Sequence, residues 1–367
     1  MEQKKLGFGL MRLPLLDPAD NGSIDIEHTK KMVDTFIEKG FTYFDTAWMY
    51  CKHQSEYATK EALVDRYPRE SYTLATKLHA NFFDTLEGAE EIFNEQLRKT
   101  GVTYFDYYLL HDLNQERYEK NTKLDCFSWL KDKKEKGLVK TIGFSFHDKA
   151  DVLDKILAEH PEMEFVQLQI NYMDWESDVV ESRKCYEVAV KYGVPVIVME
   201  PVKGGMLASV PEEVEELFKE YNPDMSVSSW AIRYTASLDN VFMVLSGMSN
   251  MEQLTDNLAY MTEFKPLNEE EKAIVEKAVE IIQAQVAVPC TGCAYCVEGC
   301  PVNIPIPTYF GLVNERAKKI DTWGKYEKAS ENAGKASECV ECGQCEAICP
   351  QHIHIIDELK KVAEMFE

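Results

Sequence analysis

The sequence predicts an α/β fold, a TIM (β/α)8 barrel followed by a smaller, mostly α-helical, cysteine-rich domain at the C-terminal end. Three observations carry this prediction. From residue 6 to about residue 265, short β-branched and aromatic runs alternate with helical patterns, as parallel βα units do. An acidic segment after Pro266 then begins a long helical pattern. Beyond it, eight of the eleven cysteines fall into two runs of identical spacing.

Eight segments are the expected strands of the barrel: Leu6–Leu10, Phe41–Asp45, Tyr72–Lys77, Tyr104–His111, Thr141–Ser145, Phe165–Ile170, Val194–Met199 and Val241–Leu245. Between them lie helical patterns such as Ile26–Lys39 and Asp125–Lys136, each followed by a glycine of the kind that ends helices. The rival fold is a doubly wound open sheet, which needs a glycine-rich phosphate turn after an early strand. Gly7-Phe8-Gly9 is too short for that fingerprint, so the barrel is favoured.

The predicted domains are a barrel over residues 1–265, a connecting helix over 266–288 and a cysteine-rich domain over 289–367. The connecting helix starts at Asn268-Glu269-Glu270-Glu271, where the acidic side chains suit the positive end of the helix dipole. The gap between the seventh and eighth strands is long. It contains Gly204-Gly205 and two helical stretches, Val210–Glu220 and Ser226–Ala236, and we expect an insertion at the top of the barrel. In the last domain, Tyr309–Lys319 has helical spacing.

The two cysteine runs predict two [4Fe–4S] clusters in a ferredoxin-like domain. In Cys-x2-Cys-x2-Cys-x3-Cys-Pro, three thiolates bind one cluster and the fourth binds its neighbour. Structural zinc sites also use paired Cys-x2-Cys units, but they have no need of a fourth cysteine followed by proline, twice. One cluster is therefore expected on Cys290, Cys293, Cys296 and Cys349, and the other on Cys339, Cys342, Cys345 and Cys300.

Length and composition indicate a globular chain. Its 367 residues, 45% of them hydrophobic, can bury a substantial core and have room for more than one domain. Neither a signal peptide nor a membrane span is indicated, so the cytoplasm is the expected location. A net charge of −23 opposes binding to nucleic acid or to an anionic membrane, and an acidic surface suits a basic redox partner protein.

Ionisable side chains stand where three barrel strands end. The second strand ends at Asp45 and is followed by Tyr50, the third ends at Lys77 and the fourth at His111. In a TIM barrel the chemistry lies at these carboxyl ends. A lysine ammonium lowers the pKa of a nearby tyrosine, and a carboxylate keeps that lysine charged. We therefore predict Tyr50 as an acid tuned by Lys77 and Asp45, with His111 orienting a carbonyl oxygen.

At these residues the chain resembles the aldo/keto reductase superfamily, whose members are TIM barrels that reduce carbonyls with a nicotinamide cofactor through an Asp, Tyr, Lys, His tetrad. The resemblance covers residues 6 to about 265, and the order and separation of its motifs make it specific. It extends to Gly7-Phe8-Gly9-Leu10-Met11-Arg12-Leu13-Pro14, Gly137-Leu138-Val139-Lys140-Thr141-Ile142-Gly143-Phe144-Ser145 and Gln167-Leu168-Gln169-Ile170-Asn171-Tyr172.

The resemblance also implies nucleotide contacts. Ser145 and Gln169 match positions that hold the nicotinamide carboxamide, and Gln253 and Asn257 match part of the adenine-side loop. The loop from Ser246 to Met251 lacks the Lys and Arg that clamp a 2′-phosphate in many members, so we expect NADH as well as NADPH to serve.

The predicted function is that of an oxidoreductase that reduces a small carbonyl with a nicotinamide cofactor and exchanges electrons with two [4Fe–4S] clusters. Nicotinamides transfer a hydride whereas a cubane cluster passes one electron, so a bridging flavin is kept open as a further cofactor. The alternative is an electron-transfer or redox-sensing protein, in which the barrel binds a nucleotide or a partner and the clusters carry the function.

Overall fold

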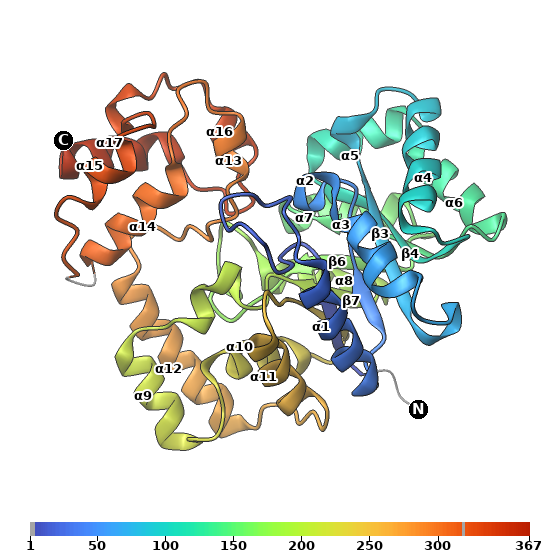
Figure 1. Cartoon of the computed structure of the whole chain (residues 1–367), viewed down its shortest axis with the longest axis horizontal. Helices are drawn as coiled ribbons and strands as arrows, with labels where there is room; N and C mark the ends of the chain where they lie inside the picture. The colour runs from blue at the N-terminus through green and yellow to red at the C-terminus, as the bar shows by residue number, and fades with distance from the viewer. Residues whose placement is uncertain (1–3, 318–319) are drawn as a thin grey trace. The chain divides into compact units, whose positions relative to one another are not determined.

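The computed structural model describes residues 4–317 and 320–367 (Figure 1). The chain divides into two compact units. The first comprises Met1–Ser177, Glu181–Pro201 and Ser228–Asn268, and the second comprises Asp178–Val180, Val202–Val227 and Glu269–Glu367. Of the predicted insertion between the seventh and eighth strands, Val202–Val227 falls in the second unit, whereas most of the predicted helical stretch Ser226–Ala236 falls in the first. In the described part of the chain, no helix has the length and apolar character to cross a membrane.

The first unit is a closed barrel of parallel strands in the order β1 to β8, as the sequence predicted. The observed strand ends lie within two residues of the predicted ones. The strands are β1 Leu6–Gly9, β2 Tyr43–Asp45, β3 Thr73–His79, β4 Phe105–Leu113, β5 Val139–Phe146, β6 Phe165–Gln169, β7 Val196–Met199 and β8 Val241–Gly247. Because consecutive side chains of a strand point to opposite faces, every second residue faces the barrel interior.

The barrel interior is filled by a layer of apolar side chains that includes Tyr43, Ala75, Leu109 and Phe165. Two residues further along each strand, on the same inward face, stand Asp45 on β2, Lys77 on β3, His111 on β4 and Gln167 on β6. The apolar layer therefore supports a polar layer at the carboxyl ends of the strands.

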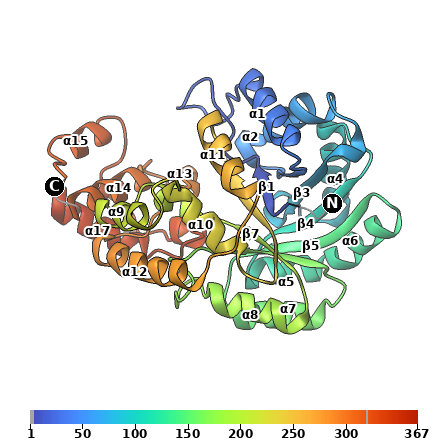
Figure 2. The same ribbon diagram turned by 90° about the horizontal axis from the view of Figure 1, so that it is seen from below.

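Helices and short 3-10 or π turns surround the strands (Figure 1). In Figure 2, α7 and α8 lie side by side outside the sheet. These elements are α1 Ile26–Glu38, α2 Tyr50–His53, α3 Ser55–Thr59, η1 Lys60–Val64, η2 Arg69–Ser71, η3 Ala80–Phe82, α4 Leu86–Thr100, α5 Gln115–Lys123, α6 Cys126–Glu135, α7 Ala150–Glu159, α8 Ser182–Tyr192, α10 Val227–Ala236 and α11 Met251–Met261. Local signals set their ends: the Asp25 carboxylate accepts from His28 N at 2.9 Å and caps α1, and α4 ends at Gly101 with φ 74°.

The second unit is mainly helical. Its elements are η4 Lys203–Ala208, α9 Glu212–Tyr221, α12 Glu269–Gln285, α13 Tyr295–Glu298, α14 Ile306–Ala317, α15 Lys325–Ser330, η5 Ala336–Glu338, α16 Gln344–Ala347 and α17 Ile355–Phe366. The predicted helix Tyr309–Lys319 corresponds to α14, and its last two predicted residues, 318 and 319, lie outside the described residues. Helix α9 packs against α12.

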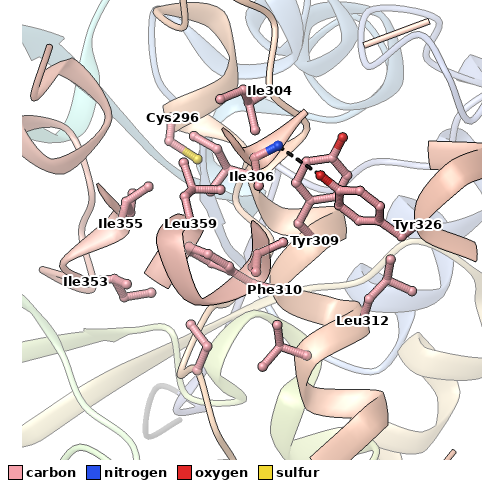
Figure 3. Packing of buried hydrophobic residues seen from close by; sticks show 14 residues of the cluster. Cys296, Ile304, Ile306, Tyr309, Phe310, Leu312, Tyr326, Ile353, Ile355 and Leu359 are labelled. Atoms are coloured by element: carbon pink, nitrogen blue, oxygen red, sulfur yellow. Dashed lines mark hydrogen bonds between the residues drawn. The ribbon is translucent and has the colours of Figure 1, made fainter. Parts of the chain in front are cut away.

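A separate hydrophobic core holds the cysteine-rich part of the second unit together (Figure 3). Tyr309 and Tyr326 belong to this core, and their ring centroids are 4.6 Å apart. Their hydroxyls satisfy buried backbone groups: Tyr309 donates to Gly334 O at 2.7 Å, and Tyr326 accepts from Ala336 N at 2.9 Å. The cysteine loops are therefore built on a packed helical base.

Candidate active site and cluster sites

A buried ion pair lies at the carboxyl end of β2 and β3. Lys77 Nζ donates to Asp45 Oδ1 and also to Thr46 O at 2.8 Å, and the Lys77 and Asp45 residues are 0% and 2% exposed. Burial raises the pKa of Asp45 and lowers that of Lys77, and the charge of each partner opposes the shift of the other. The pair therefore places a lysine of lowered proton affinity at the barrel mouth.

Tyr50 and His111 complete a contiguous group with this pair. Lys77 Nζ lies 4.8 Å from the centroid of the Tyr50 ring, and the Tyr50 and His111 rings meet edge to face with centroids 5.9 Å apart. The structure thus brings together all four residues that the sequence singled out, from β2, β3, β4 and the turn after β2.

The backbone directly after Tyr50 is left-handed. Cys51, Lys52 and His53 have φ values of 52°, 51° and 65°, a conformation in which non-glycine residues are strained. Two contacts hold the turn: the buried Cys51 thiol donates to Met11 O at 3.4 Å, and His53 Nδ1 bonds Trp48 O at 2.8 Å. This turn fixes where Tyr50 stands relative to the strand ends.

A second group of ionisable residues, which sequence reasoning missed, borders His111. The His79 ring lies 5.4 Å from the His111 ring, and Asp112 Oδ2 lies 3.3 Å from His79 Nε2 and 3.0 Å from an Arg117 guanidinium nitrogen. Asp112 has φ 59° and its backbone N–H donates to Ser145 Oγ at 2.7 Å. The signal that could have found this group is the inward face of β3, on which His79 follows Lys77 by two residues.

The environment of His111 favours the neutral imidazole. Burial lowers its pKa well below the usual value, and the neighbouring His79 and Lys77 act in the same direction. Within the described part of the chain, His111 Nδ1 is buried without a hydrogen-bond partner. A neutral ring with one N–H can donate to an oxygen and carries no charge of its own.

Four cysteines of the second unit come together around one hollow. Cys290, Cys293, Cys296 and Cys349 line one hollow, whose other walls are mostly apolar and include Phe310 and Ile353. The four thiols thus come from both cysteine runs. Cys339 and Cys345, from the second run, lie within electrostatic range of each other, and Cys342 beside them is exposed.

The other three cysteines stand apart from these runs. Cys51, Cys126 and Cys185 are buried as thiols, and burial raises their pKa to about 11, about 12 and about 12. A thiol with so high a pKa is a poor nucleophile at neutral pH.

Comparison with known families assigns a family to each of the two parts of the chain that hold these sites. Residues 5–280 match the model of the aldo/keto reductase family, and residues 289–354 match the 4Fe-4S dicluster domain. The chain belongs to the aldo/keto reductase family. It is an oxidoreductase whose reductase barrel is joined to a dicluster iron–sulfur domain.

Individual relatives agree with this assignment of the reductase barrel. An uncharacterised oxidoreductase of Bacillus subtilis is 24% identical over 69% of this chain and 89% of its own length. The holo form of an aldo-keto reductase from Bacillus halodurans superposes with a TM-score of 0.61 at 23% identity, over 75% of this chain and 91% of its own. A Klebsiella pneumoniae aldo/keto reductase in complex with NADP and acetate gives a TM-score of 0.60 at 16% identity, covering 76% of this chain and 95% of its own.

The four predicted nucleotide contacts occupy two regions of the reductase barrel. Ser145 and Gln169 are buried at the ends of β5 and β6, where Ser145 Oγ accepts from Asp112 N and Gln169 Nε2 donates to Asp174 Oδ2 at 3.0 Å. Gln253 and Asn257 lie on α11. Their side chains are bonded to the preceding loop, Gln253 Oε1 to Ser249 N at 2.7 Å and Asn257 Nδ2 to Ser246 Oγ at 2.8 Å.

Two further residues of the reductase barrel were missed as site candidates. Gln167 is 2% exposed, and its Oε1 has no hydrogen-bond partner among the described residues. Arg12 packs on Gly247, since a Cβ built on that glycine would lie 3.3 Å from the Arg12 side chain. Arg12, from the beginning of the sequence, therefore places a cation next to the loop after β8. That loop contains no Lys or Arg of its own.

Proposed function

We propose that the reductase barrel reduces a small aldehyde or ketone with NADPH or NADH, and that the dicluster domain holds two [4Fe–4S] clusters that exchange electrons with a redox partner protein. One observation carries the first part: Asp45, Lys77, Tyr50 and His111 form a single contact chain at the carboxyl end of the barrel. The bound nicotinamide would supply the hydride; the residues supply the proton and the geometry.

Tyr50 is the proposed proton donor. A tyrosine gives up its proton reluctantly at neutral pH, and a cation beside the ring stabilises the tyrosinate that the transfer leaves. Lys77 provides that charge from 4.8 Å, and Asp45 holds the ammonium in place. The reaction would then end with the Tyr50 proton on the product alkoxide oxygen, and Tyr50 would regain a proton from solvent before the next turnover.

His111 is proposed to orient the carbonyl. The neutral ring borders Tyr50 edge to face, so one N–H can donate to the same oxygen that receives the Tyr50 proton. Two donors aimed at one oxygen select the carbonyl orientation and stabilise the charge that develops on it.

The residues around this mouth fit a nicotinamide carboxamide. That group both donates and accepts hydrogen bonds, and Gln167 Oε1 is a buried acceptor lacking a partner in the described ranges. Ser145 and Gln169 lie on the same inward face of β5 and β6. In the adenine region, the amide groups at the start of α11 and the nearby Arg12 offer positive charge to a phosphate. The Klebsiella neighbour of the same fold was solved with NADP.

The cluster domain fits the proposed ligand sets. Apart from Thr291 and Gln351, the hollow lined by Cys290, Cys293, Cys296 and Cys349 has apolar walls, which suit a cluster of iron and sulfide bound only by thiolates. Beside it, Thr291 Oγ1 is buried with no hydrogen-bond partner in the described chain. We assign the second cluster to Cys339, Cys342, Cys345 and Cys300, and a bridging flavin stays a prediction.

The test is an anaerobic assay of Tyr50→Phe against a panel of small aldehydes and ketones, with nicotinamide oxidation and alcohol formation both measured. We expect carbonyl reduction to fall by about 10²–10⁴-fold while nucleotide binding and iron content stay at wild-type levels. Tyr57→Phe is the matched control, since Tyr57 is a partly exposed tyrosine outside the tetrad. Undiminished reduction by Tyr50→Phe would overturn the assignment. A wild-type protein that passes electrons from NADPH to its clusters and reduces no carbonyl would favour the electron-transfer alternative.

A further inference from the structure

The turn that follows β7 has an unusual backbone. Lys203, Gly204 and Gly205 are three successive residues with φ values of 47°, 65° and 102°. Glycine adopts this conformation readily, whereas a lysine does so only when its surroundings hold it there. The turn belongs to the second unit, and only Glu200–Val202 separate it along the chain from the end of β7.

This turn is pressed against the first cysteine loop. A Cβ built on Gly204 would lie 2.3 Å from Thr291 O and 2.6 Å from Thr291 Cβ, so no other residue fits there without a shift of the backbone. Thr291 stands directly after Cys290. The backbone of the turn is thus in contact with the residue next to a proposed cluster ligand.

Lys203 is buried at the same place. It is 3% exposed, and its Nζ donates to Gln351 Oε1 at 2.9 Å, a residue two positions after Cys349 and itself 5% exposed. Its neighbour Gly204 packs on Thr291, and both Thr291 and Gln351 line the hollow that Cys290 and Cys349 share. A buried lysine therefore contacts the stretch of chain after Cys349, and the glycine next to it contacts the stretch after Cys290.

The neighbourhood of the other ligand set has the opposite charge. Glu346, an acidic residue, directly follows Cys345, one of the proposed ligands. The Glu346 carboxylate is held there by Ile356 N at 2.9 Å. The two cysteine runs share one spacing, yet one set is paired with a buried lysine and the other with a glutamate.

We propose that Lys203 selectively raises the reduction potential of the cluster held by Cys290, Cys293, Cys296 and Cys349. Uptake of one electron from an external one-electron donor converts a [4Fe–4S]2+ core to [4Fe–4S]+ and adds one negative charge to the site. A buried ammonium favours the more negative state, because the attraction between charges is stronger in a medium of low dielectric constant. The inference rests on the proposed cluster sites and is independent of carbonyl reduction in the barrel.

The test uses the full-length holoprotein, purified anaerobically, in mediated dithionite titrations followed by EPR. Lys203→Gln removes the charge and keeps a polar partner for Gln351, Lys203→Met removes both, and Lys203→Arg keeps the charge. We expect one of the two midpoint potentials to fall in the Gln and Met variants, the other to stay at its wild-type value, and the Arg variant to titrate like the wild type. Combination with Cys293→Ser, which alters one cluster's own spectrum, identifies the cluster that shifts.

Lys360→Met is the matched control. Lys360 is an exposed lysine paired with Glu341 at 3.2 Å beside the other cysteine run, so its charge is screened by solvent and neither potential should change. Equal potentials in wild type and Lys203→Gln, with iron and sulfide contents equal, would overturn the proposal. Loss of a cluster from Lys203→Gln but not from Lys203→Arg would also overturn it, because the lysine would then serve assembly. A wild-type iron content too low for two clusters would instead contradict the cluster assignment on which the proposal rests.

Discussion

Lys77 Nζ lies 4.8 Å from the centroid of the Tyr50 ring while it donates to Asp45 Oδ1, and both Lys77 and Asp45 are buried. The lysine therefore belongs to two arrangements at once. It completes a buried ion pair that the fold must accommodate, and it places a charge beside the proposed proton donor. Stability and catalysis can be separated at this residue.

Replacing Lys77 alone should be more damaging to stability than replacing the pair. Lys77→Met leaves the Asp45 carboxylate buried without its cation, at a cost of about 3–5 kcal/mol in the free energy of unfolding. The double variant Asp45→Asn/Lys77→Met removes both charges, and we expect it to recover most of that loss while remaining inactive. Chemical denaturation followed by tryptophan fluorescence gives the energies. A double variant no more stable than the single one would contradict this account.

The lowered pKa of His111 predicts how the barrel responds to acid. Below pH 6.5 the unfolded chain takes up a proton on this ring and the folded barrel does not, so the free energy of unfolding falls as the pH falls. The contribution is at most about 1.4 kcal/mol per pH unit. In the His111→Gln variant, the free energy of unfolding should fall less between pH 6.5 and pH 5 than in the wild type. The measurement is the denaturation midpoint of each protein at the two pH values. Parallel curves for the two proteins would rule out a neutral, buried His111.

Exchange of ligands between the cysteine runs can be tested with one pair of substitutions. Cys349→Ala should disturb the cluster on Cys290, Cys293 and Cys296, with which Cys349 shares a hollow, although it lies in the other run. Cys300→Ala should disturb the cluster of the second run. Iron and sulfide analysis with EPR of the reduced protein reports which cluster changes. If each substitution affected the cluster of its own run, the crossed assignment would be wrong.

Adjacent glycines after β7 should differ in their tolerance of a side chain. Gly204 and Gly205 both have positive φ, so alanine is strained at either position, by about 1 kcal/mol or more. A Cβ on Gly204 would also collide with the Thr291 carbonyl, whereas one on Gly205 would have no atom of the described residues within 4 Å. Gly204→Ala should therefore be the more destabilising and should alter the EPR signal of one cluster. Gly205→Ala is its control, and an equal effect of the two would argue against close packing on the cysteine loop.

Much of the barrel could be predicted because the periodicity of a strand or a helix is visible within a short stretch of sequence. The inward face of β3 or β4 follows from alternation alone, and the tetrad follows from asking which polar residues end those strands. Gln167 was missed as a site residue because alternation along a strand shows only that its amide points inward. Alternation does not show whether that amide is structural or binds a ligand, and only the unsatisfied Oε1 distinguishes the two cases.

The segment Val202–Val227 could not be placed in the same way. Helix α9 is amphipathic. The sequence pattern of an amphipathic helix shows which side is apolar, but it does not show which part of the protein packs against that side. The bond between Lys203 and Gln351 joins residues 148 positions apart, a separation across which no local pattern operates. Arg12, beside Gly247, was missed for the same reason.

The discontinuity of the second unit bears on how the protein is made. A ribosome releases Lys203 and the glycine turn long before it releases Thr291 and Gln351, and α9 before α12. The nascent chain therefore carries this segment, several of whose side chains are buried in the final fold, without its partners while β8 is being synthesised to complete the barrel. Binding of iron and sulfide by the last cysteines would then stabilise a segment that was synthesised some 150 residues earlier. Loading of the cofactor and completion of the fold would therefore coincide.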